Sequence, residues 1–221
     1  MDPARLEAAL DRLFIFPLPG AVLLPHGLVP LHIFEPRYRK MAKDCAEGSR
    51  FLALGHIPDE TAAAARPPRM LPVIGVGTLA QVEPLPEGRS NIVLRGSLRA
   101  RIVEELETSE PYRLVRAVAL QEDPSERDLP AVRRAAEGLR RLVLAICSAR
   151  PGEETNALAV LAARAQDPGE LADLVAGVVL ESPAERQEVL EAVHLEERLS
   201  LAAQAAALAL AQTASPASAP N

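Results

Sequence analysis

The sequence predicts an α+β protein in which an N-terminal antiparallel β-barrel with one helix is followed by a C-terminal α-helical bundle. Most prolines and β-branched runs lie before residue 125, and alanine, leucine, glutamate and arginine recur at helical spacing after it. About six apolar runs in the first part have so little helical sequence between them that antiparallel pairing is favoured. A closed or nearly closed barrel is therefore expected.

The expected strands are apolar runs bounded by turn residues. They cover residues 13–16, 28–34, 51–57, 73–82, 91–104 and 112–120. Between the third and fourth runs, Pro67-Pro68 cannot lie inside a sheet, so a loop is expected there. The residues PLPEGRSN (84–91) are expected to turn between two long antiparallel strands.

The one helix expected among the strands covers about 36–47 and starts inside the unusual stretch LHIFEPRYRKMA (31–42). Pro36 suits the first turn of a helix and restricts Glu35 to extended geometry. Glu35 is expected to cap the helix, so its loss would cost about 1 kcal/mol or more. The residues expected to face the barrel are Tyr38, Met41, Ala42 and Cys45. Glu35, Pro36 and Tyr38 are thus predicted to form a structural corner.

The helical part begins with an expected helix over 129–149, which places one apolar stripe on a single face. Its members are Val132, Ala136, Leu139, Val143 and Ile146. Asp167 and Ser182 each precede a proline and, three positions later, a glutamate, a pattern typical of helix starts. These features predict a barrel over 1–124, a helical bundle over 125–211 and a disordered tail over 212–221, which is rich in proline and serine.

Composition excludes several classes of protein. The formal net charge of −6 and the aromatic content of 3% do not suit a nucleic-acid binder, which needs positive charge and stacking platforms. No apolar run reaches the length of a membrane span, and the N-terminus lacks the order of a signal peptide, so a cytoplasmic protein without membrane contact is expected. Cys45 and Cys147 match no metal or redox spacing.

No pattern in the chain predicts catalysis. GVGTLA (75–80) matches a dinucleotide fingerprint in letters, but the following residues alternate like a strand, where a helix would have to begin. His32, Glu35 and His56 could bind zinc only if the chain turned sharply between the first two. A P-loop and a nucleophile elbow are absent from the sequence. No catalytic residue, cofactor or metal site is therefore predicted.

Several segments, in order, resemble the N-terminal domain of Lon proteases. Leu18–Pro25 with Pro30-Leu31 is similar to that domain's opening, Val76–Ala80 to its "VGT-x-A" strand, and Leu94–Ile102 to its "V-x-G-x-x-R-ARI" strand. Residues 167–180 and 185–199 resemble its "LAD-x-IA" and "KQ-x-LLE-x-x-x-x-x-RL" helices. The stretch LHIFEPRYR looks more like freestanding Lon substrate-binding-domain proteins, and like the Lon-like modules of some RING-finger proteins, than like full-length Lon. Where Lon tends to have Gly-Arg-Glu-Lys/Arg-Ser, residues 34–38 match only in the charge of Arg37.

The resemblance implies a PUA-like barrel, a bacterial origin and a module without the ATPase and peptidase domains of Lon. It also implies binding of unfolded or degron-bearing proteins, alone or for a protease or chaperone. The tentative contact residues are Leu23, Leu24, Leu28 and Arg37, although the three leucines could instead fill the mouth of the barrel. The alternative function is a PUA-like domain that binds a small molecule or nucleotide. The sequence leaves the oligomeric state open.

Overall fold

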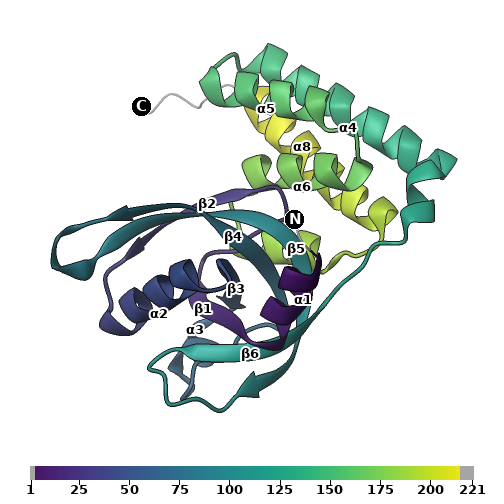
Figure 1. The fold of residues 1–221 in the computed structure, drawn as a ribbon. Helices are drawn as coiled ribbons and strands as arrows, with labels where there is room; N and C mark the ends of the chain where they lie inside the picture. The colour runs from purple at the N-terminus through teal and green to yellow at the C-terminus, as the bar shows by residue number, and fades with distance from the viewer. Residues whose placement is uncertain (1–2, 215–221) are drawn as a thin grey trace. The chain divides into compact units, whose positions relative to one another are not determined.

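A computed structural model describes residues 3–214 and divides the chain into two compact units, Met1–Gln121 and Glu122–Asn221. The first unit is a curled sheet with short helices and the second is helical (Figure 1). The first unit contains α1 (Pro3–Asp11), β1 (Leu13–Pro19), β2 (Leu28–Ile33), α2 (Pro36–Glu47), β3 (Phe51–Ile57), α3 (Glu60–Ala64), β4 (Val73–Pro84), η1 (Pro86–Gly88), β5 (Ser90–Leu106) and β6 (Arg113–Ala119). The second contains η2 (Pro124–Asp128), α4 (Pro130–Ala149), α5 (Glu153–Arg164), α6 (Pro168–Val179), α7 (Pro183–Glu191) and α8 (Leu195–Ala214).

The sheet confirms the α+β class and corrects two details of the expected barrel. Its strand order is β2-β5-β4-β3-β1-β6, with a further pairing between β5 and β6. The barrel is not closed, and β2 pairs with β5 alone among the described strands. The sheet is mixed, because β1 and β3 run parallel. A parallel pair needs a long crossover, and β2 and α2 together supply it between these two strands.

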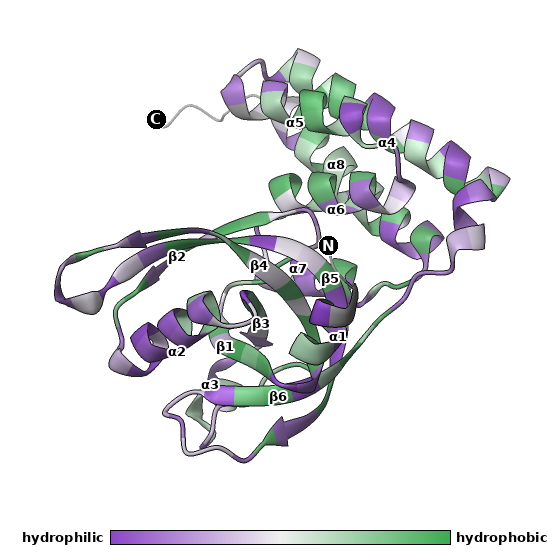
Figure 2. Cartoon of the chain, viewed as in Figure 1, coloured by the Kyte–Doolittle hydropathy of each residue, from purple (hydrophilic) through white to green (hydrophobic). Residues whose placement is uncertain are grey.

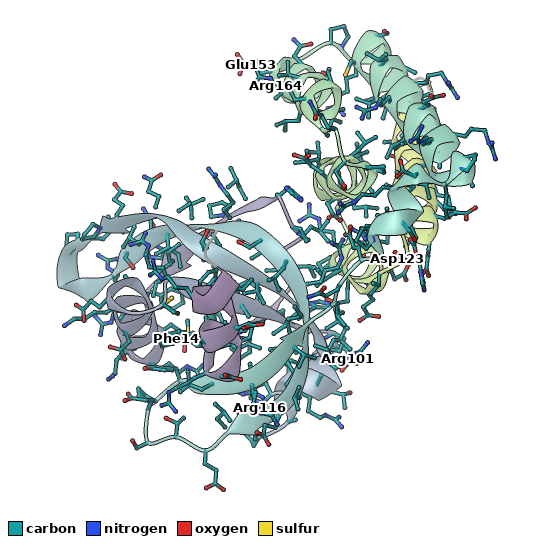
Figure 3. All side chains as sticks on the ribbon, turned by 45° about the vertical axis from the view of Figure 1, so that its right-hand side comes forward. Phe14, Arg101, Arg116, Asp123, Glu153 and Arg164 are labelled. Carbon is teal, nitrogen blue, oxygen red and sulfur yellow. The ribbon has the colours of Figure 1, made fainter. Side chains whose placement is uncertain are left out.

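Helix α2 has the predicted bounds and buries the predicted face, which consists of Tyr38, Met41, Ala42 and Cys45. The Tyr38 ring lies 4.2 Å from that of Phe16 on β1, centroid to centroid. The Asp44 carboxylate accepts hydrogen bonds from Lys40 Nζ and from the Tyr112 hydroxyl, both at 2.6 Å. Tyr112 lies just before β6, and its ring is 5.7 Å from that of Phe14, the β1 residue labelled in Figure 3. Apolar packing and a polar clamp thus hold α2 against the sheet.

The expectation of a single helix in this unit is wrong, because α1 and α3 were not predicted. Ala9 and Leu10 of α1 are buried in a second apolar cluster, separate from the one that α2 covers. In α3, the Asp59 carboxylate accepts a hydrogen bond from the N–H of Ala62 at 2.7 Å. This is an ordinary N-cap. It starts a helix too short for periodicity to reveal.

The loop between β1 and β2 packs its backbone against glycines of the sheet. A Cβ at Gly75 would lie 1.8 Å from the carbonyl oxygen of Leu23, and one at Gly96 would lie 2.0 Å from that of Leu24. The loop is also bonded to β5, because Gly96 N–H donates to the Gly27 carbonyl at 2.9 Å. The glycines of GVGTLA therefore permit a close backbone approach within a strand.

The second unit confirms the predicted apolar stripe of α4, whose five members are all buried. Figure 2 shows hydrophobic and hydrophilic residues alternating along this helix. Both predicted helix starts are also confirmed. Asp167 Oδ1 accepts from the N–H groups of Gly169 at 2.8 Å and Glu170 at 3.1 Å, and Ser182 Oγ accepts from that of Glu185 at 3.5 Å.

A buried arginine joins the helices of the second unit. Arg198 of α8 is 0% exposed, and its Nη1 lies 2.6 Å from Glu122 Oε1 and 3.4 Å from Asp173 Oδ2. Its Nε and Nη2 donate to the carbonyls of Ala192 and Val193, both at 3.0 Å. Asp173 and Arg198 lie in the two C-terminal segments that resemble Lon helices. One buried ion pair therefore joins these two segments.

The segment around η2 also fixes the start of α8. Asp123, labelled in Figure 3, accepts a hydrogen bond from the N–H of Ser125 at 2.9 Å. Glu126 Oε2 accepts from the N–H of Leu195 at 2.7 Å, and its Oε1 lies 2.7 Å from Nδ1 of His194. The Glu126 carboxylate, nearly seventy residues away in sequence, thus caps the N-terminus of α8 in place of a neighbouring side chain.

The last helix is longer than predicted. It continues through Gln212, Thr213 and Ala214, which the sequence had assigned to a disordered tail. Thr213 Oγ1 donates to the carbonyl of Leu210 at 2.6 Å, so its hydroxyl is satisfied within the helix. Residues 215–221 of the predicted tail lie outside the described part of the chain. Among the described helices, none has the length and hydropathy needed to cross a membrane.

We expect Gly75→Ala to destabilise the protein by about 1–3 kcal/mol, because the added methyl group collides with the Leu23 backbone. Gly138→Ala is the matched control, since its Cβ would meet only Arg141 Nη2 at 3.9 Å. That substitution should stabilise α4 by about 0.5–1 kcal/mol. Thermal and urea unfolding measure both, and equal effects of the two changes would contradict the close packing.

Arg198→Ala should cost about 3–5 kcal/mol, because it removes the buried cation paired with the buried Asp173 carboxylate. Arg133→Ala is the control. Its ion pair with Asp128 is formed by side chains that are 64% and 81% exposed. Such a pair contributes at most about 1 kcal/mol. Urea denaturation of both variants tests this, and a small effect at Arg198 would show that the network is not needed.

The His194–Glu126 contact should make stability depend on pH. The hydrogen bond to Glu126 raises the pKa of His194, so its contribution is present below the ordinary value of 6.5 and is lost as pH rises through the raised pKa. The hydrogen bond from His194 lowers the pKa of Glu126, so its contribution is lost as pH falls below 4.5 through the lowered pKa. The Tm difference between wild type and His194→Ala should therefore peak between pH 4.5 and 6.5. A difference that grew above pH 8 would contradict this assignment.

Candidate functional site

The outer strand of the sheet carries a line of exposed side chains. Along β2 the burial alternates, and Leu28, Pro30 and His32 are exposed while Ile33 is buried. Phe34, immediately after the strand, continues the line. Leu28 is 59% exposed and Phe34 is 60% exposed, the highest values among the large hydrophobic residues of the first unit. We call Leu28, Pro30, His32 and Phe34 the β2 stripe.

The polar end of the stripe has a defined hydrogen-bond order. Asn91 Nδ2 donates to Glu83 Oε2 at 3.1 Å, and Asn91 Oδ1 lies 2.9 Å from Nδ1 of His32. A carboxylate only accepts, so the amide must present its oxygen to the imidazole, and Nδ1 of His32 must carry a proton. In the neutral ring, Nε2 is then an acceptor. The His32 ring also stacks on that of Phe34, with centroids 5.9 Å apart and planes at 21°.

At the predicted corner, the expected capping role of the Glu35 side chain is wrong. Glu35 occupies the N-cap with extended geometry and Pro36 follows it, yet its side chain makes no capping bond. Its carboxylate instead lies 2.8 Å from Nη2 of Arg37, two residues away. The Arg37 guanidinium stacks 4.6 Å from the Tyr38 ring centroid. Loss of Glu35 should therefore cost only the value of an exposed ion pair, about 0–1 kcal/mol.

The tentative contact residues separate into two groups. Leu23 and Leu24 are 0% and 3% exposed and belong to the core, as the alternative interpretation stated. Leu28 and Arg37 remain at the surface. His32 and Phe34 are also exposed, and the sequence analysis had not placed them with Leu28 on one surface. The signal was present in the alternation from Leu28 to Phe34 around a proline that marks an edge strand.

The residues considered for chemistry are not brought together. His32 is exposed, whereas His56 is buried and burial lowers its pKa. Over residues 3–214, no three histidine, cysteine, aspartate or glutamate side chains gather as a metal site. Burial raises the pKa of the Cys45 thiol to about 12, which suits a core residue and not a thiolate nucleophile.

The family model described as "ATP-dependent protease La (LON) substrate-binding domain" matches residues 12–205. The Lon protease of Chloroflexus aurantiacus is 30% identical over 197 residues, which are 89% of this chain and 23% of that protein. The Lon protease of Anaeromyxobacter dehalogenans is 30% identical over 190 residues, 85% of this chain and 22% of that protein. The chain thus spans about a quarter of the length of these curated relatives.

Solved structures agree with the fold. The N-terminal domain of the Mycobacterium avium complex Lon protease has a TM-score of 0.71 at 20% identity and covers 89% of this chain and 98% of its own. The Lon N-terminal domain protein of Xanthomonas campestris has a TM-score of 0.60 at 19% identity and covers 86% and 95%. The family match extends from the start of the sheet through the first half of α8. The chain belongs to the Lon substrate-binding domain family.

Proposed function

We propose that this chain is a non-catalytic module that binds unfolded or degron-bearing polypeptides in the cytoplasm, by itself or for a protease or chaperone. The observation that carries the proposal is the β2 stripe. A non-native polypeptide differs from a folded one in its accessible apolar side chains and unpaired backbone. The stripe offers exposed apolar groups on a strand that, within residues 3–214, is paired on one side only.

The shape of the stripe favours a polymer over a small ligand. Small-molecule sites are concave and enclose most of the ligand surface. Leu28, on the outer strand β2, and Phe34, immediately after it, are instead more than half exposed. They are six residues apart, which corresponds to about 20 Å along an extended chain. A polypeptide segment can contact both ends at once.

Family membership supports the same proposal. The matched region is named for substrate binding, and it accounts for about a quarter of each Lon protease compared. The buried Cys45 and the separated histidines give no arrangement for covalent or metal-assisted chemistry. Binding without turnover is therefore the function that the described residues support best.

The stripe can be tested with Phe34→Ser, which removes its largest apolar group without touching the core. Wild-type protein should slow the aggregation of chemically denatured malate dehydrogenase, and Phe34→Ser should weaken this activity at least about threefold, since an exposed aromatic contact is worth about 1 kcal/mol or more. Val118→Ser on β6 is the control, because Val118 is also a half-exposed apolar strand residue. The proposal fails if wild-type protein has no effect on denatured clients. The assignment to the stripe fails if both variants lose activity equally.

A further inference from the structure

The register of β2 identifies which backbone groups face away from the sheet. Gly96 N–H donates to the Gly27 carbonyl, so Gly27 faces β5. In an antiparallel ladder, residues whose backbone N–H and C=O groups point to the neighbouring strand alternate with residues whose groups point away. The backbone groups that point to β5 are therefore those of Val29, Leu31 and Ile33. Those that point away from the sheet are of Leu28, Pro30 and His32. The position of Pro30 supports this assignment independently, because proline has no backbone N–H and is tolerated in a strand where that N–H would point away from the ladder.

The outward residues of the edge are therefore the strand residues of the β2 stripe. Leu28 and His32 each present an N–H and a carbonyl, and Pro30 presents a carbonyl alone. The described residues provide no partner strand on this side of β2. One set of residues thus offers backbone hydrogen bonds and apolar side chains to the same incoming chain.

The two ends of the stripe differ in charge. Leu28 is paired across the ladder with Arg95, whose exposed side chain rises on the same face. At the other end, Glu83 is bonded to Asn91 beside His32. An arginine is long enough to reach over one neighbouring strand, so an acidic side chain on an incoming chain would be favoured beside Leu28. The opposite end favours a neutral or basic residue.

A second copy of this chain fits the edge poorly. Two β2 strands related by a two-fold axis through Pro30 would bring two prolines together, so neither could donate to the facing carbonyl. The edge is therefore better matched to a different polypeptide.

We propose that the free edge of β2 binds an extended polypeptide by strand addition, with a segment of about seven residues that carries an acidic side chain at the Leu28–Arg95 end and apolar side chains at alternate positions. This inference rests on the proposed function and specifies how the stripe binds. Main-chain hydrogen bonds supply binding that tolerates many sequences, and the stripe and Arg95 select among them.

The test uses labelled, end-blocked peptides of eight residues in which valine and threonine alternate and one terminal residue is glutamate. Two peptides, with glutamate first or last, cover both strand directions. Fluorescence anisotropy should show that one of them binds at least about threefold more tightly than its glutamate-to-lysine version. A four-residue version and one with N-methylated valines should each bind at least about tenfold more weakly, since several hydrogen bonds of 0.5–1.5 kcal/mol are lost.

Two substitutions in the protein isolate the backbone contribution. His32→Ala removes the side chain and keeps the outward N–H, whereas His32→Pro removes both and leaves the bonds to β5 intact. His32→Pro should bind the peptide about 2–10-fold more weakly than His32→Ala, the value of one hydrogen bond. Circular dichroism and thermal unfolding check that both variants fold. If His32→Pro does not fold, the same comparison is made between Leu28→Pro and Leu28→Ala.

The outcomes separate this inference from the proposed function. Strand addition is overturned if N-methylated and unmodified peptides bind equally while denatured malate dehydrogenase is still held, and the function then stands. Both fail if neither peptide nor client binds. If sedimentation shows a dimer that His32→Pro dissociates, the edge pairs with a second copy and the proposed occupant is wrong.

Discussion

The approach of the β1–β2 loop to the glycines of β4 and β5 is the constraint on which the first unit depends. The carbonyl oxygens of Leu23 and Leu24 lie where side chains at Gly75 and Gly96 would otherwise stand. This contact buries two leucines and delivers the chain to the start of β2 in one register. From that start, β2 pairs with β5 and with no other described strand. The exposed stripe is therefore a consequence of the packing beneath it.

The second unit is specified in a different way, through charge inside an apolar bundle. Arg198 is fully buried, and its donors reach a carboxylate from the connecting segment, one from α6 and two backbone carbonyls. A buried ion pair adds little net stability compared with apolar packing, but it penalises every arrangement that leaves a charge unpaired. Alanine-rich helices such as α8 can slide with little loss of packing. A buried arginine with fixed partners favours one register.

The features that the sequence predicted correctly are those set by residues close together in the chain. The α4 stripe, the caps at Asp167 and Ser182 and the bounds of α2 follow from periodicity and from proline placement, and all are present. The failures involve partners distant in sequence or competition at short range. Glu126 caps α8 from another segment, and Arg37 takes the Glu35 carboxylate from the helix N-terminus. The parallel pairing of β1 with β3 was not predicted, because it depends on how the chain crosses over between these two strands. Of the β2 stripe, only Leu28 was among the predicted contact residues, because the sequence does not show which leucines of this segment the fold buries.

Pro30 shows how one residue can protect an edge and leave it usable. A free strand edge invites pairing with any other chain, and proline is a common defence because it removes one donor. Here the donors on either side of Pro30 still face outward, at a spacing that an extended chain can match. Pairing of two β2 strands through Pro30 would place two missing N–H donors opposite each other, whereas a polypeptide without proline at that position would meet only one. If strand addition occurs as proposed, the edge disfavours its own copy and accepts other extended chains, which is the discrimination that a polypeptide-binding module needs.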